Sequence, residues 1–370
     1  MSGTGRADVV YEAPGRTPAE LAKRFLVWAD HECRGRTPLY ERLSYAIAAD
    51  EELLRLAAHA RQGQPVPNLL FGAVQFLLLR GEGPELARFY RTLGGTYTPD
   101  DDPFPAFRAF CLAHWDEIAA IEQTRLVQTA HARRCALLLP AFELVSRTFD
   151  RRPLALIEVG ASAGLNLVWD RYAYTYSNGR RAGPADAAVQ LTCELHGALA
   201  PPIPEALPAV GWRLGLDLNP IDLRDTDEAL WLRALIWPDE PGRAELLRQA
   251  ITAAGAGPPS LVAGDALETL PAAVAEAPQE LPLCIYHSFT LNQFSSEGRR
   301  RFAELVSKLA RGRELALISL EALSRATPVP DLTVQLGAEM RPRLLAHCDA
   351  HGAWLEWLDA ETAAARGAGG

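Results

Sequence analysis

The sequence predicts an α/β protein in which an all-α N-terminal half precedes a doubly wound, mostly parallel sheet. Residues 18–149 follow helical periodicity between glycine and proline breaks, and they show no strand pattern. After residue 150, short apolar runs that end in small or acidic residues alternate with amphipathic stretches, as in parallel strands joined by helices. We therefore expect a helical domain or cap over 1–150 and a sheet domain over 151–370.

Length, composition and charge bound the class of protein. The chain has 370 residues, 48% of them hydrophobic, enough for one large or two modest domains. A net charge of −9 argues against a nucleic-acid or anionic-membrane binder. Six scattered cysteines without C-x-x-C spacing indicate free thiols and no metal framework. We find neither a signal peptide nor a long apolar run, and expect a cytoplasmic protein without a membrane span.

One stretch of the helical half carries candidate chemistry, Thr124-Arg125-Leu126-Val127-Gln128-Thr129. The periodicity of residues 107–149 predicts helix here, so Arg125 and Gln128 share a face at i and i+3. A helix that enters the first strand usually packs beside the first loop of the sheet. We therefore expect Arg125 to meet a ligand carboxylate and Gln128 a backbone or substrate group. A plain surface arginine beside a glutamine is the alternative.

The first strand and the loop after it organise the sheet half. Residues 154–159 form an apolar run interrupted only by Glu158, which is typical of a buried parallel strand. A turn of small residues follows, Gly160-Ala161-Ser162-Ala163-Gly164, and then an apolar helical face. Such a turn presents unpaired backbone N–H groups to a charged ligand. Asn166 is a candidate either for capping that helix or for touching the ligand.

Several interpretations of this turn stay open. A dinucleotide fingerprint needs glycine where Ser162 and Leu165 stand, so that interpretation is weak. The run is also formally G-x-S-x-G, a hydrolase nucleophile elbow with Ser162 as nucleophile, and Asp265 and His287 follow in hydrolase chain order. Against it, about 150 helical residues precede the first strand, whereas an elbow serine normally follows several strands. An ordinary tight turn is a further alternative.

Residues Glu158 to Gly164 resemble the acid-x-G-x-G-x-G loop of class I S-adenosylmethionine-dependent methyltransferases, with Ser162 in place of the middle glycine. The resemblance implies that Gly160, Ala161, Ser162 and Gly164 let the backbone approach the methionine end of this cofactor. An acid two places before the first glycine suits a cationic ligand that carries an ammonium and a sulfonium.

An insert at about 172–211 separates this unit from the next sheet strand. Tyr172-Ala173-Tyr174-Thr175-Tyr176 alternates, Ser177-Asn178-Gly179 offers a turn, and residues 189–195 alternate again. We expect a β-hairpin and a proline-rich loop that covers the cofactor site as a lid. Tyr174 and Tyr176 then either line a substrate pocket or pack as an aromatic ladder.

Two later strands end in acidic residues. The run 212–217 ends in Asp217, where an acid can accept hydrogen bonds from both ribose hydroxyls, and Leu218, Asn219 and Pro220 follow. This G-x-D-x-N-P run resembles the matching methyltransferase motif, and a turn or cap role for Asp217 is the alternative. Residues 260–263 lead to Gly264-Asp265-Ala266, where the resemblance implies an acid on the adenine amino group.

The fourth expected strand, 281–288, ends in His287 and Ser288. In the resembled fold its carboxyl end faces the transferred methyl group, so His287 is a candidate general base and Ser288 a candidate substrate-orienting group. A structural histidine is the alternative. The N-P-P-Y or D-P-P-Y run of amino methyltransferases is missing, which argues against a nucleic-acid base as acceptor. We expect a fifth strand at 314–320, then a closing antiparallel pair at 333–336 and 353–358 with a helix at 341–350 between them.

These motifs imply a seven-stranded, Rossmann-like methyltransferase sheet over residues 154–358. E-V-G-A-S-A-G-L-N-L, G-L-D-L-N-P and T-R-L-V-Q-T resemble more closely a bacterial family known only as a domain of unknown function. We expect a methyltransferase that uses S-adenosylmethionine, needs no metal and acts on a small-molecule acceptor. A non-catalytic cofactor-binding or regulatory protein with the same fold is the alternative, and a serine hydrolase using Ser162 is the third possibility.

Overall fold

A computed structural model describes residues 17–128, 130–323, 329–337, 339–359 and 361. The chain divides into two compact units. The helical unit comprises Met1–Thr129 and Thr226–Glu245, and the sheet unit comprises Ala130–Asp225 and Leu246–Gly370. The division therefore does not follow the single boundary predicted at residue 150. Residues 130–150 group with the sheet, and residues 226–245 group with the helices.

The helical unit is built around one buried helix, α4. Its helices are α1 (Pro18–Trp28), η1 (Ala29–Cys33), α2 (Pro38–Ile47), α3 (Glu51–Ala57), α4 (Val66–Leu79), α5 (Pro84–Ala87), η2 (Arg91–Leu93), α6 (Phe104–Ala113), α7 (Trp115–Thr124) and α9 (Thr226–Ala234). Gly72 of α4 leaves room for Trp231 of α9, whose ring would lie 3.0 Å from a β-carbon at that position. The Gln75 side chain donates to the Ile236 carbonyl, 2.8 Å away. These contacts explain why residues 226–245 belong with the helices.

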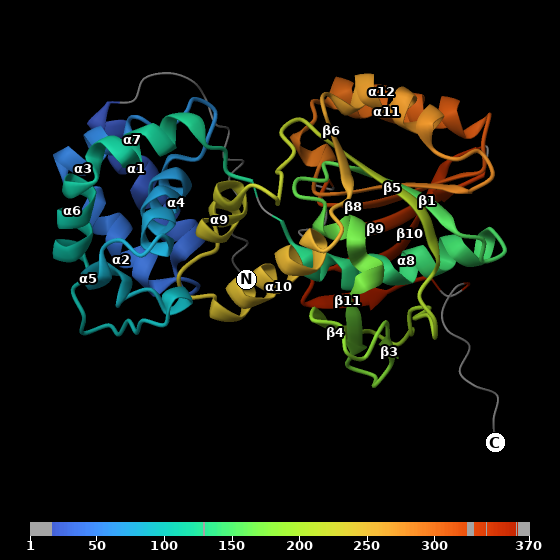
Figure 1. Ribbon diagram of the computed structural model, residues 1–370, viewed down its shortest axis with the longest axis horizontal. Coiled ribbons are helices and arrows are strands. Elements are labelled where there is room, and N and C mark those ends of the chain that lie inside the picture. Colours follow the sequence, from blue (N-terminus) through green and yellow to red (C-terminus); the bar gives the residue numbers. More distant parts are fainter. Residues whose placement is uncertain (1–16, 129, 324–328, 338, 360, 362–370) are drawn as a thin grey trace, which may run out of the picture. The chain divides into compact units, whose positions relative to one another are not determined.

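The sheet unit contains one sheet of 11 strands in the order β3-β2-β4-β11-β10-β9-β8-β7-β1-β5-β6 (Figure 1). The strands are β1 (Leu154–Val159), β2 (Ala173–Tyr176), β3 (Arg181–Ala182), β4 (Gln190–His196), β5 (Val210–Asp217), β6 (Ser260–Ala263), β7 (Leu283–Ser288), β8 (Leu315–Glu321), β9 (Asp331–Leu336), β10 (Arg341–Cys348) and β11 (Trp354–Trp357). The helices are η3 (Ala132–Arg134), α8 (Cys135–Thr148), η4 (Leu165–Arg171), α10 (Pro241–Gly255), which begins in the helical unit, α11 (Ala266–Glu276), η5 (Leu291–Gln293) and α12 (Ser296–Ala310).

The mixed α/β class is confirmed, and the predicted number of seven strands is wrong. Strands β6, β5, β1, β7 and β8 are parallel neighbours, as a doubly wound sheet requires. Residues 341–348 form β10 and not the expected helix, because they pair with β9 on one side and β11 on the other. Sheet pairing here overrides the local helical preference of leucine and alanine. The insert adds β2, β3 and β4 to the sheet.

The insert also pairs differently from the prediction. The hairpin closes between β2 and the two-residue strand β3, and β4 runs parallel to β2. The buried side chains of Tyr172, Tyr174 and Tyr176 donate their hydroxyl groups to the carbonyls of Leu165, Trp169 and Ala136, respectively. The tyrosines are therefore packing residues, and the insert extends the sheet through the pairing of β4 with β11.

Helices cover the two faces of the parallel strands. On one face, α11 and α12 pack over Ala155 and Ile157 of β1. On the other face lies α8, whose Phe142 ring stacks on Trp169 at 4.6 Å and meets Tyr286 edge-on at 5.1 Å. Neighbouring positions of β1 and β7 therefore point into different environments. This alternation separates Glu158 and Tyr286 from Val159 and His287.

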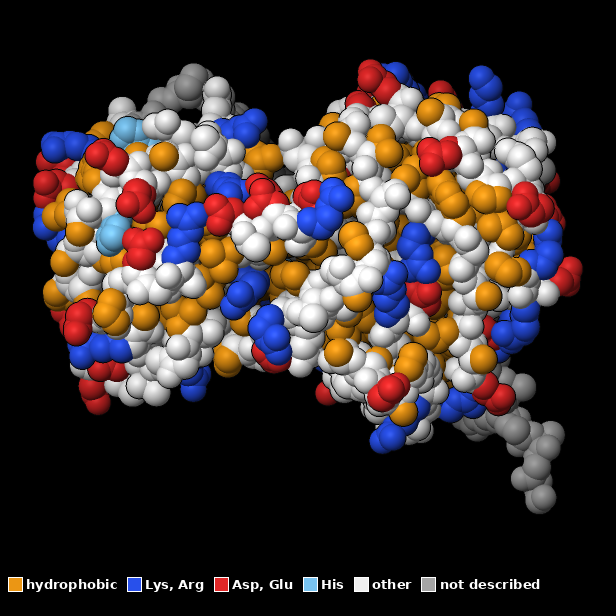
Figure 2. Space-filling model, viewed as in Figure 1, with side chains coloured by type: hydrophobic (Ala, Val, Ile, Leu, Met, Phe, Trp, Pro, Cys, Tyr) orange, Lys and Arg blue, Asp and Glu red, His pale blue; other side chains and the backbone are white. Residues whose placement is uncertain are grey.

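Two further features concern the charges on the surface and the length of the helices. Basic and acidic side chains are interspersed on the face shown in Figure 2. Within the described part of the chain, no helix is both long enough and apolar enough to cross a membrane.

Candidate functional site

The candidate site lies where the sheet changes its winding direction. From β1 the chain winds outward through β5 and β6, and then returns to β7 and β8 on the other side of β1. Ligands of doubly wound sheets bind outside the carboxyl ends of the strands at this switch point. The predicted residues from 158 to 166, 217 to 219, 264 to 266 and 287 to 288 all follow or end these parallel strands.

The loop after β1 is a sharp turn with alternating left-handed residues. Gly160, Ser162 and Gly164 have φ values of +76°, +51° and +69°. A side chain at Gly160 would collide with Thr290, whose Oγ1 would lie 2.1 Å from the added β-carbon. The N–H groups of Gly160 and Ala161 both donate to the Leu216 carbonyl. The geometry explains why small residues stand here and why glycine is favoured at position 162.

Asp217 fastens this loop to the end of β5. Its Oδ2 accepts the N–H of Ser162 at 2.8 Å, and its Oδ1 accepts the N–H of Asn219 at 2.8 Å. Asp217 therefore stabilises this turn, which is the role given above as the alternative to ribose binding. The binding of ribose hydroxyl groups by Asp217 stays a prediction. The next side chain, Leu218, is 67% exposed and offers an apolar surface beside the acid.

Glu158 is buried at the end of β1, between Gly215 and Tyr286 of the neighbouring strands. Its carboxyl group accepts from Asn166 Nδ2 at 3.2 Å and from the Tyr286 hydroxyl at 3.4 Å. Burial raises the pKa of Glu158 to about 8, and the Asp217 carboxylate adds to the shift. The Asn166 hydrogen bond opposes it but does not cancel it. A cation near this carboxyl would favour the ionised form.

Asn166 is held within the protein and does not cap a helix. Its Oδ1 accepts from Cys135 Sγ at 3.3 Å, while its Nδ2 donates to Glu158. The expected helix is the 3₁₀ segment η4, which begins after the left-handed Gly164. Asn166 therefore orients the Glu158 carboxyl, a role that the sequence pattern does not indicate.

The loop after β6 forms a helix cap. Asp265 is exposed and accepts the N–H of Leu267 at 2.8 Å, at the N-terminus of α11. Gly264 has a φ of +144° and donates its N–H to the Asp217 carbonyl. The buried Ala266 begins α11. A role of Asp265 at an adenine amino group stays a prediction, because its capping bond occupies only part of its acceptor capacity.

His287 is completely buried on the face covered by α12. Its Nδ1 lies 2.8 Å from Glu321 Oε1, and its ring meets Phe302 edge-on at 5.7 Å. Its Nε2 has no hydrogen-bond partner among the described residues. This arrangement matches the structural alternative for His287. The general-base role stays a prediction that needs this ring to become accessible.

Glu321 is the acid that the sequence analysis missed. Besides His287, its carboxylate accepts the N–H groups of Thr290, Leu291 and Asn292 at 2.8, 2.9 and 3.2 Å. Burial acts to raise the pKa of Glu321, but the hydrogen bond and charge of His287 and the backbone bonds outweigh it and lower the pKa. Only the pairing of β7 with β8 brings these residues together, so local sequence gives no signal for them.

Ser288 is buried on the opposite face, where it meets another residue that the sequence analysis missed. Arg134 Nη1 lies 3.3 Å from Ser288 Oγ, and Arg134 Nε donates to the Ala350 carbonyl at 2.9 Å. The guanidinium also lies 4.1 Å from the centre of the Phe289 ring, a cation–π contact. Arg134 lowers the pKa of Glu158, although burial dominates. Arg134 ends η3 just before α8, and this position is the local feature that could have drawn attention to it in the sequence.

Arg125 and Gln128 lie in the helical unit, and their predicted helix is wrong. Helix α7 ends at Thr124, and residues 125–128 are not helical, so the i, i+3 relationship does not place the two side chains on one face. Arg125 forms an ion pair with Glu228 and lies over the Trp231 ring at 5.9 Å. Gln128 is half-buried.

The structure does not assemble the hydrolase triad. The Oγ of Ser162 is buried and, within the described part of the chain, has no hydrogen-bond partner. The acid on His287 Nδ1 is Glu321, while Asp265 caps α11. The left-handed backbone of Ser162 and its place in a turn after β1 do fit a nucleophile elbow.

Comparison with known proteins identifies the family of the chain. The model of a family described as "Uncharacterized protein conserved in bacteria (DUF2332)" matches residues 22–357. Neither a curated protein nor a solved structure matches the chain.

Proposed function

This chain belongs to the bacterial family DUF2332, and we propose that it binds S-adenosylmethionine at the Gly160–Gly164 loop and transfers the methyl group to a small-molecule acceptor. The observation that carries the proposal is the pair of acids on either side of this loop. Glu158 is buried two residues before Gly160, and Asp217 holds the Ser162 N–H from the neighbouring strand β5.

The buried acid suits a cationic ligand. Without a ligand, burial favours the neutral form of Glu158, whose pKa is raised to about 8. A cation within about 4–6 Å lowers the pKa of a carboxyl group and favours its ionised form. An ammonium or sulfonium at this loop would therefore replace the proton of Glu158. Ligand binding near pH 7 should release a proton from the protein.

The other end of the site suits a nucleoside. Asp217 ends β5, a position from which an acid can accept ribose hydroxyl groups, and Leu218 offers an exposed apolar side chain to a flat base. When bound, the cofactor would supply the electrophilic methyl group. The protein would hold its charged end at Glu158 and exclude water through the buried residues of β1 and β7.

One observation favours a second candidate, a binding protein without turnover. His287, the predicted base, is fully buried and its Nδ1 is bonded to Glu321. A general base must come within hydrogen-bond reach of the proton that it accepts. A protein that binds the cofactor but lacks an accessible base would act as a sensor or a regulatory partner.

Isothermal titration calorimetry on the full chain tests both candidates. We expect S-adenosylmethionine and its demethylated product to bind and NAD not to bind. Repeating the titration near pH 7 in buffers of different ionisation enthalpy should reveal the proton released from Glu158. Binding with formation of demethylated product on a panel of small acceptors supports the methyltransferase. Binding without turnover supports the second candidate, and binding of NAD alone would overturn both.

A further inference from the structure

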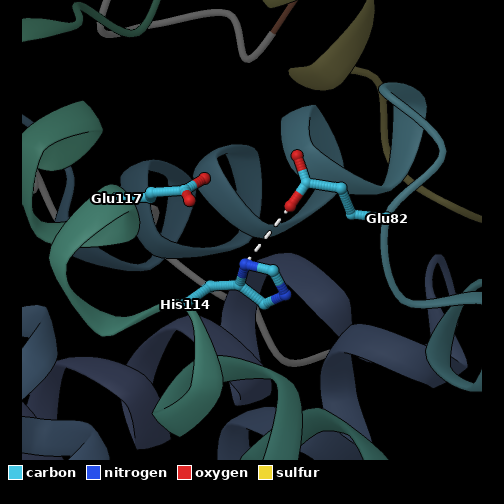
Figure 3. Close-up of side chains that lie close together, drawn as sticks. All are labelled: Glu82, His114 and Glu117. Carbon is cyan, nitrogen blue, oxygen red and sulfur yellow. Dashed lines mark ion pairs between the residues drawn. The ribbon is translucent and has the colours of Figure 1, made fainter.

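A separate cluster of metal-ligating side chains lies in the helical unit. Glu82 follows α4, His114 stands between α6 and α7, and Glu117 lies in the first turn of α7. One ligand atom from each of the three side chains lies within 4.8 Å of the other two. Figure 3 shows the two carboxyl groups facing each other, with the imidazole next to them. The cluster plays no part in the site at the sheet.

The cluster is held in place by an aromatic ring. Phe110 lies against His114, with ring centres 4.3 Å apart. The same ring leaves no room for a side chain at Gly83, because an added β-carbon would come within 2.4 Å of it. The backbone beside Glu82 and the imidazole of His114 therefore pack on the same ring. Two segments of chain, about 30 residues apart in sequence, are fixed with their ligand atoms together.

The spacing fits a metal ion. His114 Nδ1 and Glu82 Oε2 are 3.2 Å apart. Two ligand atoms at this separation, each about 2.1 Å from one ion, subtend an angle of roughly 100° at it, between octahedral and tetrahedral geometry. Glu117 is exposed, and its carboxylate lies within reach of the other two ligand atoms, so it can complete the set.

We infer that Glu82, His114 and Glu117 form a site for a divalent transition-metal ion, with Zn²⁺ as the best-suited ion. Imidazole nitrogen favours zinc and its transition-metal neighbours, while Mg²⁺ and Ca²⁺ prefer sets made only of oxygen ligands. Three protein ligands leave at least one coordination position for water or another ligand, as in open zinc sites. Binding to the folded chain alone would raise its thermal stability.

Zinc titration of the full chain tests this inference. Calorimetry with Zn²⁺ alone should show one ion bound per chain, and Zn²⁺ should raise the melting temperature more than Mg²⁺ at equal concentration. Glu117→Gln removes one exposed ligand without touching the core, and His114→Ala removes the nitrogen ligand. Each variant should weaken zinc binding by at least about tenfold, since even indirect partners of a metal are worth 10–100-fold.

Two matched variants control for general effects. Glu85→Gln changes another exposed acid in the first turn of a helix, and His31→Ala removes a histidine of the same unit that lies outside the cluster. Both should bind zinc like the natural chain. Equal binding by Glu117→Gln and the natural chain would show that zinc goes elsewhere and would overturn the site. So would the lack of any zinc binding at concentrations on the order of 1 mM, the weak end of specific affinity.

Discussion

His287 Nδ1 lies 2.8 Å from Glu321 Oε1, and the same oxygen accepts the backbone N–H groups of Thr290 and Leu291. The histidine thus helps to orient the carboxylate that fixes the loop after β7. Thr290 in turn donates its hydroxyl to the Val159 carbonyl and fills the space beside Gly160. A chain of contacts therefore runs from a buried pair under α12 to the loop at the candidate site.

We expect His287→Ala to lower the stability of the fold and to leave the rate of methyl transfer per folded molecule largely unchanged. The substitution leaves a buried carboxylate without its side-chain donor and opens a cavity, which should lower the free energy of unfolding by about 2–4 kcal/mol. Urea denaturation measures this. His347→Ala is the matched control, because His347 also bonds an acid, Asp331, at 2.9 Å but is only half-buried. We expect it to cost under about 1 kcal/mol.

The opposite outcome would favour the general-base role. A fully stable His287→Ala protein whose methyl transfer is about 10²–10⁴-fold slower would make His287 a catalytic residue. Single-turnover transfer and denaturation, measured on the same preparation, separate the two roles.

Glu158→Gln should change how stability depends on pH. The folded-state pKa of Glu158 is about 8, against an ordinary value of 4.5, so the folded protein binds more protons than the unfolded chain between these values. Stability therefore falls as pH rises from about 4.5 to 8, by at most about 1.4 kcal/mol per pH unit from this group. Gln does not titrate. Unfolding from pH 5 to 8 should show the variant gaining stability over the natural chain, and parallel profiles would contradict the prediction.

Ser162→Gly should stabilise the protein by up to about 1 kcal/mol, because Ser162 has a left-handed backbone that glycine adopts without strain. Thermal melts test this. Ala161→Gly is the control, since Ala161 does not have a positive φ and should lose stability.

A related substitution separates two functions for the same residue. Ser162→Ala should leave methyl transfer largely intact, because the proposed loop uses only its backbone. In a serine hydrolase the same change would cost several orders of magnitude in rate. Labelling of Ser162 by a fluorophosphonate would support the hydrolase.

Asp217→Asn should weaken S-adenosylmethionine binding by about 1–3 kcal/mol, since one acceptor of a ligand hydroxyl becomes a donor. The amide oxygen can still accept the Ser162 N–H, which keeps the tie to the loop after β1, while the Asn219 N–H loses its acceptor. Calorimetry measures the affinity. Asp222→Asn is the control, because Asp222 lies nearby in the chain and its carboxylate pairs with Arg224, outside the loop after β1. Equal affinity of both variants would remove Asp217 from the site.

The strands that could be predicted from the sequence are those whose hydrophobic pattern is clear within a few residues. The apolar run of β1, the small-residue turn and the strand ending in Asp217 all lie where expected. β10 was not predicted, because its leucines and alanine suit a helix and only pairing with β9 and β11 makes it a strand. The predicted helix around Arg125 is wrong because α7 ends one residue before it, and the contact of Arg125 with a ligand carboxylate stays a prediction.

The missed residues depend on contacts that are distant in sequence. Glu321 meets His287 across two neighbouring strands, 34 residues apart. Arg134 meets Ser288 across 154 residues. Their chemistry is visible in the sequence only as an acid at the end of one expected strand and as one arginine among several, so the pattern cannot pair them.

The anchoring of the loop after β7 through its backbone has a consequence for mutational tolerance. Glu321 holds the N–H of Asn292 and not its side chain, and the side chains of Asn292 and Gln293 are exposed. A backbone anchor accepts nearly any residue except proline, which has no N–H to donate. Evolution or a saturation library can therefore exchange the two side chains at the rim of the site while the loop keeps its course. These two side chains can thus vary within the family without any change to the support beneath.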